Sequence, residues 1–422
     1  FLSGILMEQQ TLDNNTDVLI IGGGPAGLMA AEELTSYNCR VLLIDAMPTI
    51  GRKFLMAGRS GLNITTVRKN HLKKYGRAKG WIAPMILNYG PENIIDFCKS
   101  LGQEIFIGTS ERVFPRAMKA SPLLRAWLKK LKNNGVNIRT SSRWLGINNT
   151  ENTKLDSDHL THKIHSSGQV YSISARATVF AMGGASWPKL GSDGIWAAIL
   201  KKYFGKSEDF IIPFSASNMG VKVSWSSHMV RFEGSPVKSI ALKINDLMEK
   251  GEFLITKTGL EGGIVYSFST AIEDDVKILE VDLLPDISMK NMIKRLSKKS
   301  RKISMTNYLR KSLGLKGVKM ALFREFAFPY PDSLLDLAKN VKNLKIIIDD
   351  FYPLEFAIST KGGLSKKAFD NSLMLNDLPS VFCAGEMLDW SAPTGGYLLT
   401  GCFATGSHAG RSVAKFLNLK KL

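Results

Sequence analysis

The sequence has few cysteines, and none of them belongs to a C-x-x-C pair. Four occur in 422 residues, at Cys39, Cys98, Cys383 and Cys402. Single cysteines scattered in this way do not indicate a disulfide framework, a zinc ribbon or a dithiol reductase site. We therefore expect a protein of the reducing cytoplasm.

Long hydrophobic runs are also missing. The longest, such as 18–21 and 41–44, have the length of a strand, whereas a membrane-spanning helix needs about 20 apolar residues. Residues 1–6 are apolar but have neither a basic flank nor a small-residue cleavage site, so we expect no signal peptide and leave them out of the fold prediction. With 44% hydrophobic and 22% charged residues, the chain is expected to be a folded globular protein, and its 422 residues predict two or three structural units.

Acidic residues are absent between Asp286 and Glu325, a stretch that contributes much of the formal net charge of +19. Its cations include Lys290, Lys294, Arg295, Lys298, Lys299, Arg301, Lys302, Arg310, Lys311, Lys316 and Lys319. A basic surface attracts phosphates, nucleic acid and acidic lipids. No nucleic-acid-binding motif accompanies it, so we favour a solvated helical face and keep RNA binding as an alternative.

Three histidines, at His159, His162 and His165, are spaced three residues apart near Asp156 and Asp158. This spacing permits a metal site, but the stretch resembles a polar hairpin and has no cysteine nearby. We expect a solvated hairpin and no metal.

A glycine-rich turn near the start of the sequence predicts a dinucleotide site. A β-branched run at 17–21 leads into Gly22-Gly23-Gly24-Pro25-Ala26-Gly27, which matches G-x-G-x-x-G, and a helix-like segment and a second strand at 40–44 follow. In this motif the first glycine permits the tight turn, the second lets the backbone approach a pyrophosphate, and the third lets helix and strand pack closely. The helix N-terminus attracts the phosphates. Asp45, at the end of the second strand, is placed to accept hydrogen bonds from ribose hydroxyls.

Two later segments favour FAD over NAD. The apolar strand at 175–181 leads into Met182-Gly183-Gly184, where glycine allows close passage of a cofactor. The strand at 378–384 is followed by Gly385-Glu386, a strand–glycine–acid element in which the acid would accept bonds from the ribityl chain.

The chain then continues through Pro393-Thr394-Gly395-Gly396-Tyr397 into an apolar helix. A glycine pair at a helix start can direct backbone N–H groups to the N1–C2=O edge of a flavin. On chemical type, Tyr397 is the best candidate for a proton donor, although a packing role fits a tyrosine there better. We name no catalytic acid or base.

The segment 51–65 combines glycines, cations and small polar residues. Such a loop suits contact with pyrophosphate and flavin: Arg52 and Lys53 could neutralise phosphate, and Asn63 could bond a flavin edge. Together the segments predict the following cofactor-binding residues: Gly22, Gly24, Pro25, Ala26, Gly27, Asp45, Ala46, Arg52, Lys53, Asn63, Ala181, Gly183, Gly184, Gly385, Glu386, Thr394, Gly395, Gly396, Tyr397 and Leu398.

The strings Gly-Arg-Lys-Phe-Leu-Met-Ala-Gly at 51–58 and Ala-Gly-Glu-Met-Leu-Asp-Trp at 384–390 resemble the HI0933-like flavoprotein family, often labelled NAD(P)/FAD-dependent oxidoreductase. The resemblance spans nearly the whole chain. One departure is Gly61-Leu62-Asn63, where the broader family has Gly-Arg-Cys-Asn. Some relatives look like reductases of carbon–carbon double bonds, including those of steroid-like substrates.

The resemblance implies an α/β fold: a Rossmann-like FAD-binding domain of the two-dinucleotide-binding-domain flavoprotein type, interrupted by an inserted β-rich and helical region. We expect the first part of the FAD domain at 13–200, the β-rich insertion at 201–285, the helical basic insertion at 286–343 and the second part of the FAD domain at 344–422.

The function expected from the sequence is hydride transfer through flavin N5, to or from a small organic substrate. The sequence has no second G-x-G-x-x-G, so NAD(P)H is expected to serve as a transient donor without a Rossmann domain of its own. Two alternatives stay open: a flavin-dependent RNA-modifying enzyme that binds RNA on the basic helical segment, and a non-catalytic FAD-binding sensor.

Overall fold

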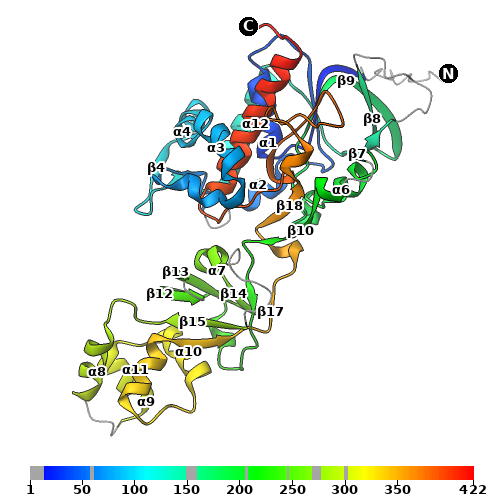
Figure 1. Ribbon diagram of the computed structural model, residues 1–422. Helices are drawn as coiled ribbons and strands as arrows, with labels where there is room; N and C mark the ends of the chain where they lie inside the picture. Colours follow the sequence, from blue (N-terminus) through cyan, green and yellow to red (C-terminus); the bar gives the residue numbers. More distant parts are fainter. Residues whose placement is uncertain are drawn as a thin grey trace, which may run out of the picture. The chain divides into compact units, whose positions relative to one another are not determined.

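The computed structural model describes residues 14–57, 61–148, 159–204, 208–244, 247–268, 277–298 and 303–422 (Figure 1). These residues form two compact units. The first comprises the chain up to Phe214, Lys361–Ala392 and Gly396–Leu422, and the second comprises Ser215–Thr360 with Pro393–Gly395. The expected mixed α/β fold with a Rossmann-type domain is confirmed.

A seven-stranded sheet forms the centre of the first unit. Its strands run in the order β6, β2, β1, β9, β8, β7, and β19 also pairs with β9. The contacts of β1 with β2 and β9, of β2 with β6 and of β9 with β19 are parallel, whereas β7, β8 and β9 pair antiparallel. Parallel strands are buried on both faces, and the run Val-Leu-Leu-Ile of β2 is fully buried as this rule requires. The strands are β1 (Asn15–Ile21), β2 (Val41–Ile44), β6 (Asn137–Arg139), β7 (Ser142–Ile147), β8 (Leu160–Ser166), β9 (Gln169–Phe180) and β19 (Val381–Cys383).

Helices α1 (Pro25–Leu34) and α12 (Tyr397–Phe416) lie side by side in the first unit (Figure 1). Small residues let them approach closely. A Cβ added to Gly406 would lie 2.2 Å from the carbonyl oxygen of Ala26, and one added to Gly410 would lie 2.8 Å from that of Ala30. The first and last helices of this unit are therefore in backbone contact.

The first unit also contains a small three-stranded sheet in the order β3, β5, β4 and a set of further helices and 3₁₀ turns. They are α2 (Arg52–Met56), β3 (Thr65–Thr66), α3 (Lys79–Asn88), α4 (Pro91–Ser100), β4 (Ile105–Ile107), β5 (Arg112–Pro115), α5 (Ala120–Asn133), α6 (Ile195–Leu200) and the 3₁₀ turns η1 (His71–Ala78), η2 (Pro188–Leu190), η6 (Lys366–Ala368) and η7 (Gly385–Met387).

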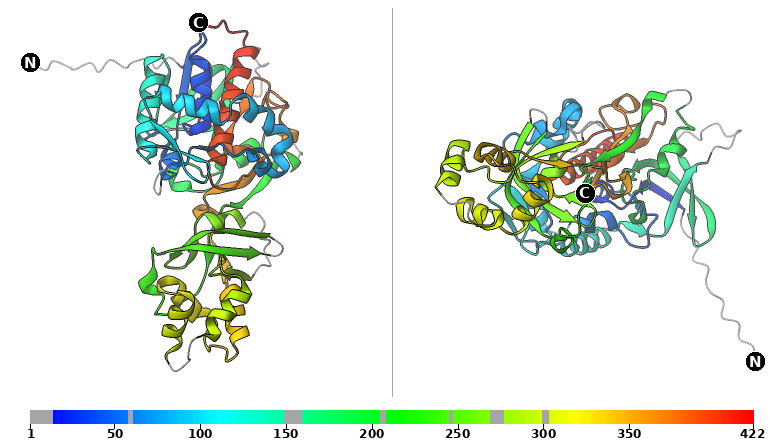
Figure 2. Two further views of the ribbon diagram at one scale, coloured as in Figure 1. Left: turned by 90° about the vertical axis from the view of Figure 1, so that its left-hand side faces the viewer. Right: turned by 90° about the horizontal axis from the view of Figure 1, so that it is seen from below.

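The second unit is built on a seven-stranded antiparallel sheet in the order β16, β15, β12, β13, β14, β11, β17. Helices α8 to α11 gather on one side of it (Figure 2). The elements are β11 (Val221–Lys222), β12 (Pro236–Ile244), β13 (Leu247–Thr256), β14 (Gly259–Glu261), α7 (Gly263–Phe268), β15 (Ile278–Asp282), α8 (Met289–Ser297), α9 (Met305–Leu313), α10 (Gly317–Ala327), α11 (Leu334–Lys342), β16 (Leu344–Ile347) and β17 (Asp350–Phe351).

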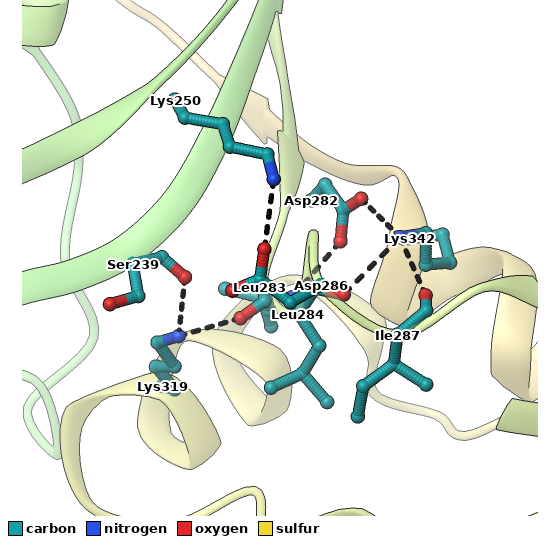
Figure 3. Close-up of polar contacts among 9 residues, drawn as sticks. All are labelled: Ser239, Lys250, Asp282, Leu283, Leu284, Asp286, Ile287, Lys319 and Lys342. Atoms are coloured by element: carbon teal, nitrogen blue, oxygen red, sulfur yellow. Dashed lines mark hydrogen bonds and ion pairs between the residues drawn. The ribbon is translucent and has the colours of Figure 1, made fainter.

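Two lysines of the basic helical segment bind backbone carbonyls within the second unit (Figure 3). The ammonium group of Lys319 donates to the carbonyl oxygen of Leu283 at 2.7 Å, and that of Lys342 donates to those of Leu284 and Ile287 at 3.2 and 3.0 Å. Both lysines thereby join the helices to the loop that follows β15. Both ammonium groups therefore stabilise the fold of the second unit.

The boundaries between the units differ from those expected. The chain leaves the first unit along β10 (Ile211–Ser217) and returns along β18 (Ser359–Leu364), and these strands pair with each other. The expected return at 344–348 instead contains β16, an edge strand that pairs antiparallel with β15 in the second unit. The helical segment expected from 286 to 343 contains α8 to α11.

The three spaced histidines belong to, or immediately precede, strand β8, and they differ in burial. His159 and His165 are exposed, whereas His162 is fully buried between Trp144 and Thr178. The indole Nε1 of Trp144 donates to Nδ1 of His162 at 3.2 Å, and Nε2 of His162 lies 2.8 Å from the hydroxyl of Thr178. The expectation that the whole set is solvated is therefore wrong for His162, because alternate residues of a strand face opposite sides of the sheet.

Burial lowers the pKa of His162 from 6.5 to about 3, so the ring is neutral in the folded protein. In the unfolded chain it takes up a proton near pH 6.5. Its contribution to stability is thus complete above pH 6.5 and falls as the pH drops towards 3. Between pH 7 and 5 we expect the free energy of unfolding to fall by about 2 kcal/mol from this group.

A pH series of urea unfolding checks this expectation. The variant His162→Gln should lack this part of the pH dependence, while His165→Gln, on the same strand but exposed, should retain it. If the free energy of unfolding changes with pH equally in wild type and His162→Gln, the assignment of a neutral buried ring is wrong.

Within the described ranges, no group of three or more His, Cys, Asp or Glu side chains is arranged to hold a metal ion. In the same ranges, every helix is either too short or too polar to cross a bilayer.

Candidate functional site

The turn that follows β1 contains two glycines that packing within the protein requires. The backbone N–H of Gly22 donates to the carbonyl of Ile44 at 2.8 Å, and its φ is 110°. A Cβ on Gly22 would lie 2.3 Å from the carbonyl oxygen of Ala181, and one on Gly27 would lie 2.0 Å from the carbonyl oxygen of Gly22. Any side chain at these two positions would displace backbone atoms.

Gly24 is different, because the packing of the described residues gives no reason for glycine there. Its φ is −79°, which every residue adopts, and no heavy atom lies within 4 Å of the position that a Cβ would take. Gly24 is the N-cap of α1 and is followed by Pro25 and Ala26. Helix N-termini present unpaired N–H groups and favour negative charge. The open space over Gly24 is thus where a phosphate could approach the backbone closely.

Asp45 lies directly after β2 and is held against this turn. One carboxylate oxygen accepts from the N–H of Gly23 at 2.7 Å, and the other accepts from the N–H of Met47 at 2.8 Å. Burial raises the pKa of Asp45, while these two hydrogen bonds and the cations Arg143 and Arg52 act against that rise. Each oxygen can accept a further hydrogen bond, which is what a ribose diol requires. The neighbouring Ala46 is half-buried.

Lys53 and Glu386, which are far apart in the sequence, form an ion pair. The ammonium group of Lys53 lies 2.6 Å from a carboxylate oxygen of Glu386 and donates to the hydroxyl of Ser186 at 2.8 Å. The two charged side chains are 24% and 14% exposed. The sequence had suggested separate roles for them: Lys53 would neutralise a phosphate, and Glu386 would accept hydrogen bonds from the ribityl chain. In the structure the charge of Lys53 is already balanced by a carboxylate.

The strand ends of β9 and β19 complete the same edge of the sheet. The N–H of Ala181 donates to the carbonyl of Ile21 at 2.8 Å. Gly183 follows with φ 73° and is half-buried, and Gly184 is buried. After β19, a Cβ on Gly385 would lie 2.7 Å from the Cβ of Ala26. The glycine-rich segments after β1, β9 and β19 are therefore close neighbours.

The N-terminus of α12 packs on strand β3. Gly396 caps the helix with φ 93°, and its Cβ would lie 2.5 Å from the backbone carbon of Thr65. Tyr397 is buried, its ring packs edge-on against Tyr75, and its carbonyl accepts from the Tyr75 hydroxyl at 2.7 Å. These contacts fit the packing role considered for Tyr397. Leu398 is half-buried.

Thr394 and Gly395 fall in the second unit. The N–H of Thr394 donates to the side-chain oxygen of Asn218 at 3.0 Å within that unit.

Asn63, in the segment before β3, has a buried amide whose polar atoms lack partners. Neither its oxygen nor its nitrogen makes a hydrogen bond to any of the described residues. A buried amide without partners costs free energy, so a ligand that bonds to both atoms would remove this penalty. Gly24 and Asn63 together show that the residues present fit a bound dinucleotide cofactor.

Most of the predicted residues thus meet at one place, the carboxyl edge of the parallel strands β1, β2, β9 and β19. Ligands of open α/β sheets bind outside this edge. Sequence reasoning missed two side chains there. They are Ser186, which bonds Lys53, and Thr405, whose hydroxyl accepts from the N–H of Gly385 at 3.0 Å. Ser186 lies two residues after the string Met182-Gly183-Gly184, which the sequence pattern did indicate, whereas nothing near Thr405 in the sequence marks it.

A Rossmann-type sheet with this glycine turn and acid is the architecture of dinucleotide-binding proteins, and its family match identifies the protein as an FAD-dependent oxidoreductase. The chain belongs to the HI0933-like family, because the model of the HI0933-like protein Rossmann domain matches residues 16–412.

Two relatives match almost the whole chain. The 3-dehydro-bile acid delta(4,6)-reductase of Clostridium scindens is 24% identical, with 94% of this chain and 98% of the relative covered. The ribosomal RNA dihydrouridine synthase of Haemophilus influenzae is 25% identical, with 90% and 94% covered. Among solved structures, the 3-ketosteroid-delta4-(5alpha)-dehydrogenase from Rhodococcus jostii RHA1 matches with 16% identity and a TM-score of 0.47, covering 97% of this chain and 99% of that one.

Proposed function

We propose that the protein reduces a carbon–carbon double bond conjugated to a carbonyl group in a small organic molecule, with NAD(P)H as the electron donor. Two observations carry the proposal: the open space over Gly24 at the carboxyl edge of the Rossmann sheet, and the unpartnered amide of Asn63 in the segment before β3, which both fit FAD. Bound FAD would supply hydride transfer through its N5 atom. The choice of bond is supported by the relatives, whose names describe a delta(4,6)-reductase and a dihydrouridine synthase.

In this proposal each residue has a defined task. The backbone at Gly24 and the start of α1 bind the pyrophosphate, and Asp45 binds the ribose of the adenosine. Asn63 bonds the polar edge of the flavin, and the N–H groups after Gly396 stabilise negative charge at its N1–C2=O edge. Glu386, already paired with Lys53, accepts from the ribityl chain.

The proposed donor has no Rossmann domain of its own, since G-x-G-x-x-G occurs once in the sequence. NADH or NADPH would therefore bind transiently, deliver its electrons and leave before the organic substrate binds. The two substrates would then take turns at one site, which predicts ping-pong kinetics.

The test is a visible spectrum of the purified protein under anaerobic conditions. Flavin absorption bands would support bound FAD, and their bleaching by NADH or NADPH would support the proposed donor. Their return when a 4-en-3-oxo steroid is added would support reduction of a conjugated double bond. If the protein binds flavin but neither NADH nor NADPH reduces it, NAD(P)H is not the electron donor. That result would favour another reductant or a non-catalytic sensor. A protein that takes up no FAD would overturn the proposal.

A second candidate function, the modification of RNA, is favoured by one observation on α8. Lys290 and Lys294 of α8 and Lys298, its C-cap, are exposed and recur every four residues, while Met292 and Leu296 are buried on the opposite side. Like charges at this spacing repel and weaken a helix. A row of phosphates would relieve that repulsion, and no acid lies between Asp286 and Glu325 to do so locally.

Replacing all three lysines of α8 by glutamate tests this candidate. If the helix binds RNA, the affinity for a ribosomal RNA fragment at low salt should fall by more than about tenfold, and the slope of log affinity against log salt should become shallower by up to about 2. The matched control is the triple change of Arg125, Lys129 and Lys132 to glutamate, on the exposed side of α5. Equal losses in both variants would point to non-specific attraction by the net charge.

A further inference from the structure

The small sheet of β3, β5 and β4 brings an arginine close to the start of α12. Thr66 of β3 pairs with Arg112 of β5, and the adjacent Thr65 contacts Gly396, the cap of α12. The hydroxyl of Thr65 also lies 2.7 Å from that of Thr400 in the first turn of the helix. Arg112 therefore belongs to the structure that supports the helix expected to face the flavin.

Arg112 is half-buried, and among the described residues no oxygen is found to accept a hydrogen bond from its guanidinium group. The nearby Arg68 is different: its Nε donates to the carbonyl of Ser110 at 3.0 Å and lies 3.9 Å from a carboxylate oxygen of Glu111. The local acid thus faces Arg68, and Arg112 is left without an anion.

Burial and the positive charge of Arg68 lower the pKa of Arg112, while the nearby Tyr397 opposes this shift. A cation taken partly out of water beside a like charge is unfavourable unless an acceptor meets it. Groups kept in such a state are commonly found where a ligand supplies the missing partner.

The neighbours of Arg112 indicate which ligand this is. Tyr397 is the first residue of α12, and the segment 61–64 that carries the unpartnered amide of Asn63 leads directly into β3. These are the residues assigned to the flavin, whereas the turn assigned to the pyrophosphate lies after β1. An arginine next to the residues assigned to the flavin is suited to bind the molecule that reacts with the flavin.

We propose that Arg112 is the substrate-anchoring residue of this enzyme and that it donates hydrogen bonds to the carbonyl oxygen conjugated to the double bond. The assignment rests on the proposed reduction of a conjugated double bond. A guanidinium group suits the role because it stays charged, presents several N–H donors, and binds oxygen more strongly as negative charge develops on it.

The test compares the FAD-loaded variants Arg112→Met and Arg112→Lys with wild type in three measurements. These are the melting temperature, the dissociation constant of FAD, and the binding of 4-nitrophenol, whose phenolate places a negative oxygen where the carbonyl oxygen would lie. Because 4-nitrophenol binding needs no turnover, this readout stands even if the protein reduces no conjugated carbonyl compound. The matched control is Arg116→Met, which removes an exposed arginine just beyond β5 that pairs with Glu104.

We expect Arg112→Met to bind 4-nitrophenol at least about tenfold more weakly, Arg112→Lys to recover part of the loss, and Arg116→Met to behave as wild type. The melting temperature of Arg112→Met should be unchanged or higher, because an unpaired charge is removed. A clear fall in melting temperature would assign Arg112 to the fold and overturn the proposal. So would weaker FAD binding with unchanged binding of 4-nitrophenol, since Arg112 would then belong to the cofactor.

Discussion

Replacing Gly24 by valine is expected to abolish FAD binding and leave the protein folded. The fold can accept the change because φ is −79° and no described atom lies within 4 Å of the added Cβ. The cofactor cannot, because a branched side chain would fill the space through which the pyrophosphate approaches the backbone. We expect the dissociation constant of FAD to rise at least about 100-fold, which corresponds to about 2.7 kcal/mol.

Fluorescence titration of the apoprotein with FAD measures the affinity, and circular dichroism with thermal melting reports the fold. Valine is a poorer N-cap than glycine, so a loss of about 1 kcal/mol in stability is expected. The control is Gly27→Ala, whose Cβ would lie 2.0 Å from the carbonyl oxygen of Gly22 and which should impair folding itself. Wild-type FAD affinity in a folded Gly24→Val variant would show that the cofactor does not approach this turn.

The second large effect is expected from the ion pair of Lys53 with Glu386. Replacing Lys53 by methionine would leave the carboxylate of Glu386, 14% exposed, without its cation. Breaking a buried pair in this way costs about 3–5 kcal/mol. Since both side chains keep some contact with water, we expect the free energy of unfolding of the first unit to fall by about 2–3 kcal/mol.

Urea unfolding of the apoprotein, followed by hydrogen exchange in the first unit, measures this change. The double variant Lys53→Met, Glu386→Leu should regain much of the loss, because neither charge is then left unpaired. The surface pair of Lys99 with Asp96, whose side chains are 61% and 76% exposed, provides the control, and Lys99→Met should change stability by less than about 0.5 kcal/mol. A similar small effect at Lys53 would mean that solvent already screens the pair with Glu386.

The glycine turn could be predicted from the sequence because its chemistry is local. Gly22 and Gly27 contact atoms of the same turn and of the strand ends beside it. The order of strand, glycine turn and helix can be recognised in one continuous stretch of sequence, from β1 to the end of α1. The pairing of Lys53 with Glu386 could not be predicted, since it joins positions 333 residues apart and depends on β19 lying beside β9. Arg112 escaped notice for a similar reason, because an arginine in a short strand is usually exposed and paired.

The return of the chain to the first unit was placed too early because a short apolar run does not specify its sheet. In β16 burial alternates, with Leu344 and Ile346 buried and Lys345 and Ile347 exposed. This is the pattern of an antiparallel edge strand, whereas β2 is buried at every residue, as a central parallel strand is. The lysine within the run was the available signal. The prediction for His162 failed for a related reason. Burial alternates along β8, and His162 is buried while the flanking Thr161 and Lys163 are not fully buried.

The backbone contact between α1 and α12 has a consequence for the order in which a growing chain can fold. Ribosomes deliver residues in sequence, so the turn at 22–27 emerges early, while Gly406 and Gly410, against which α1 packs, emerge near the end of the described chain. The second unit lies almost entirely in one uninterrupted stretch and can close on itself during synthesis. The carboxyl edge of the parallel strands is complete only after β19 and α12 have been synthesised. We therefore expect FAD to bind after most of the described chain has left the ribosome.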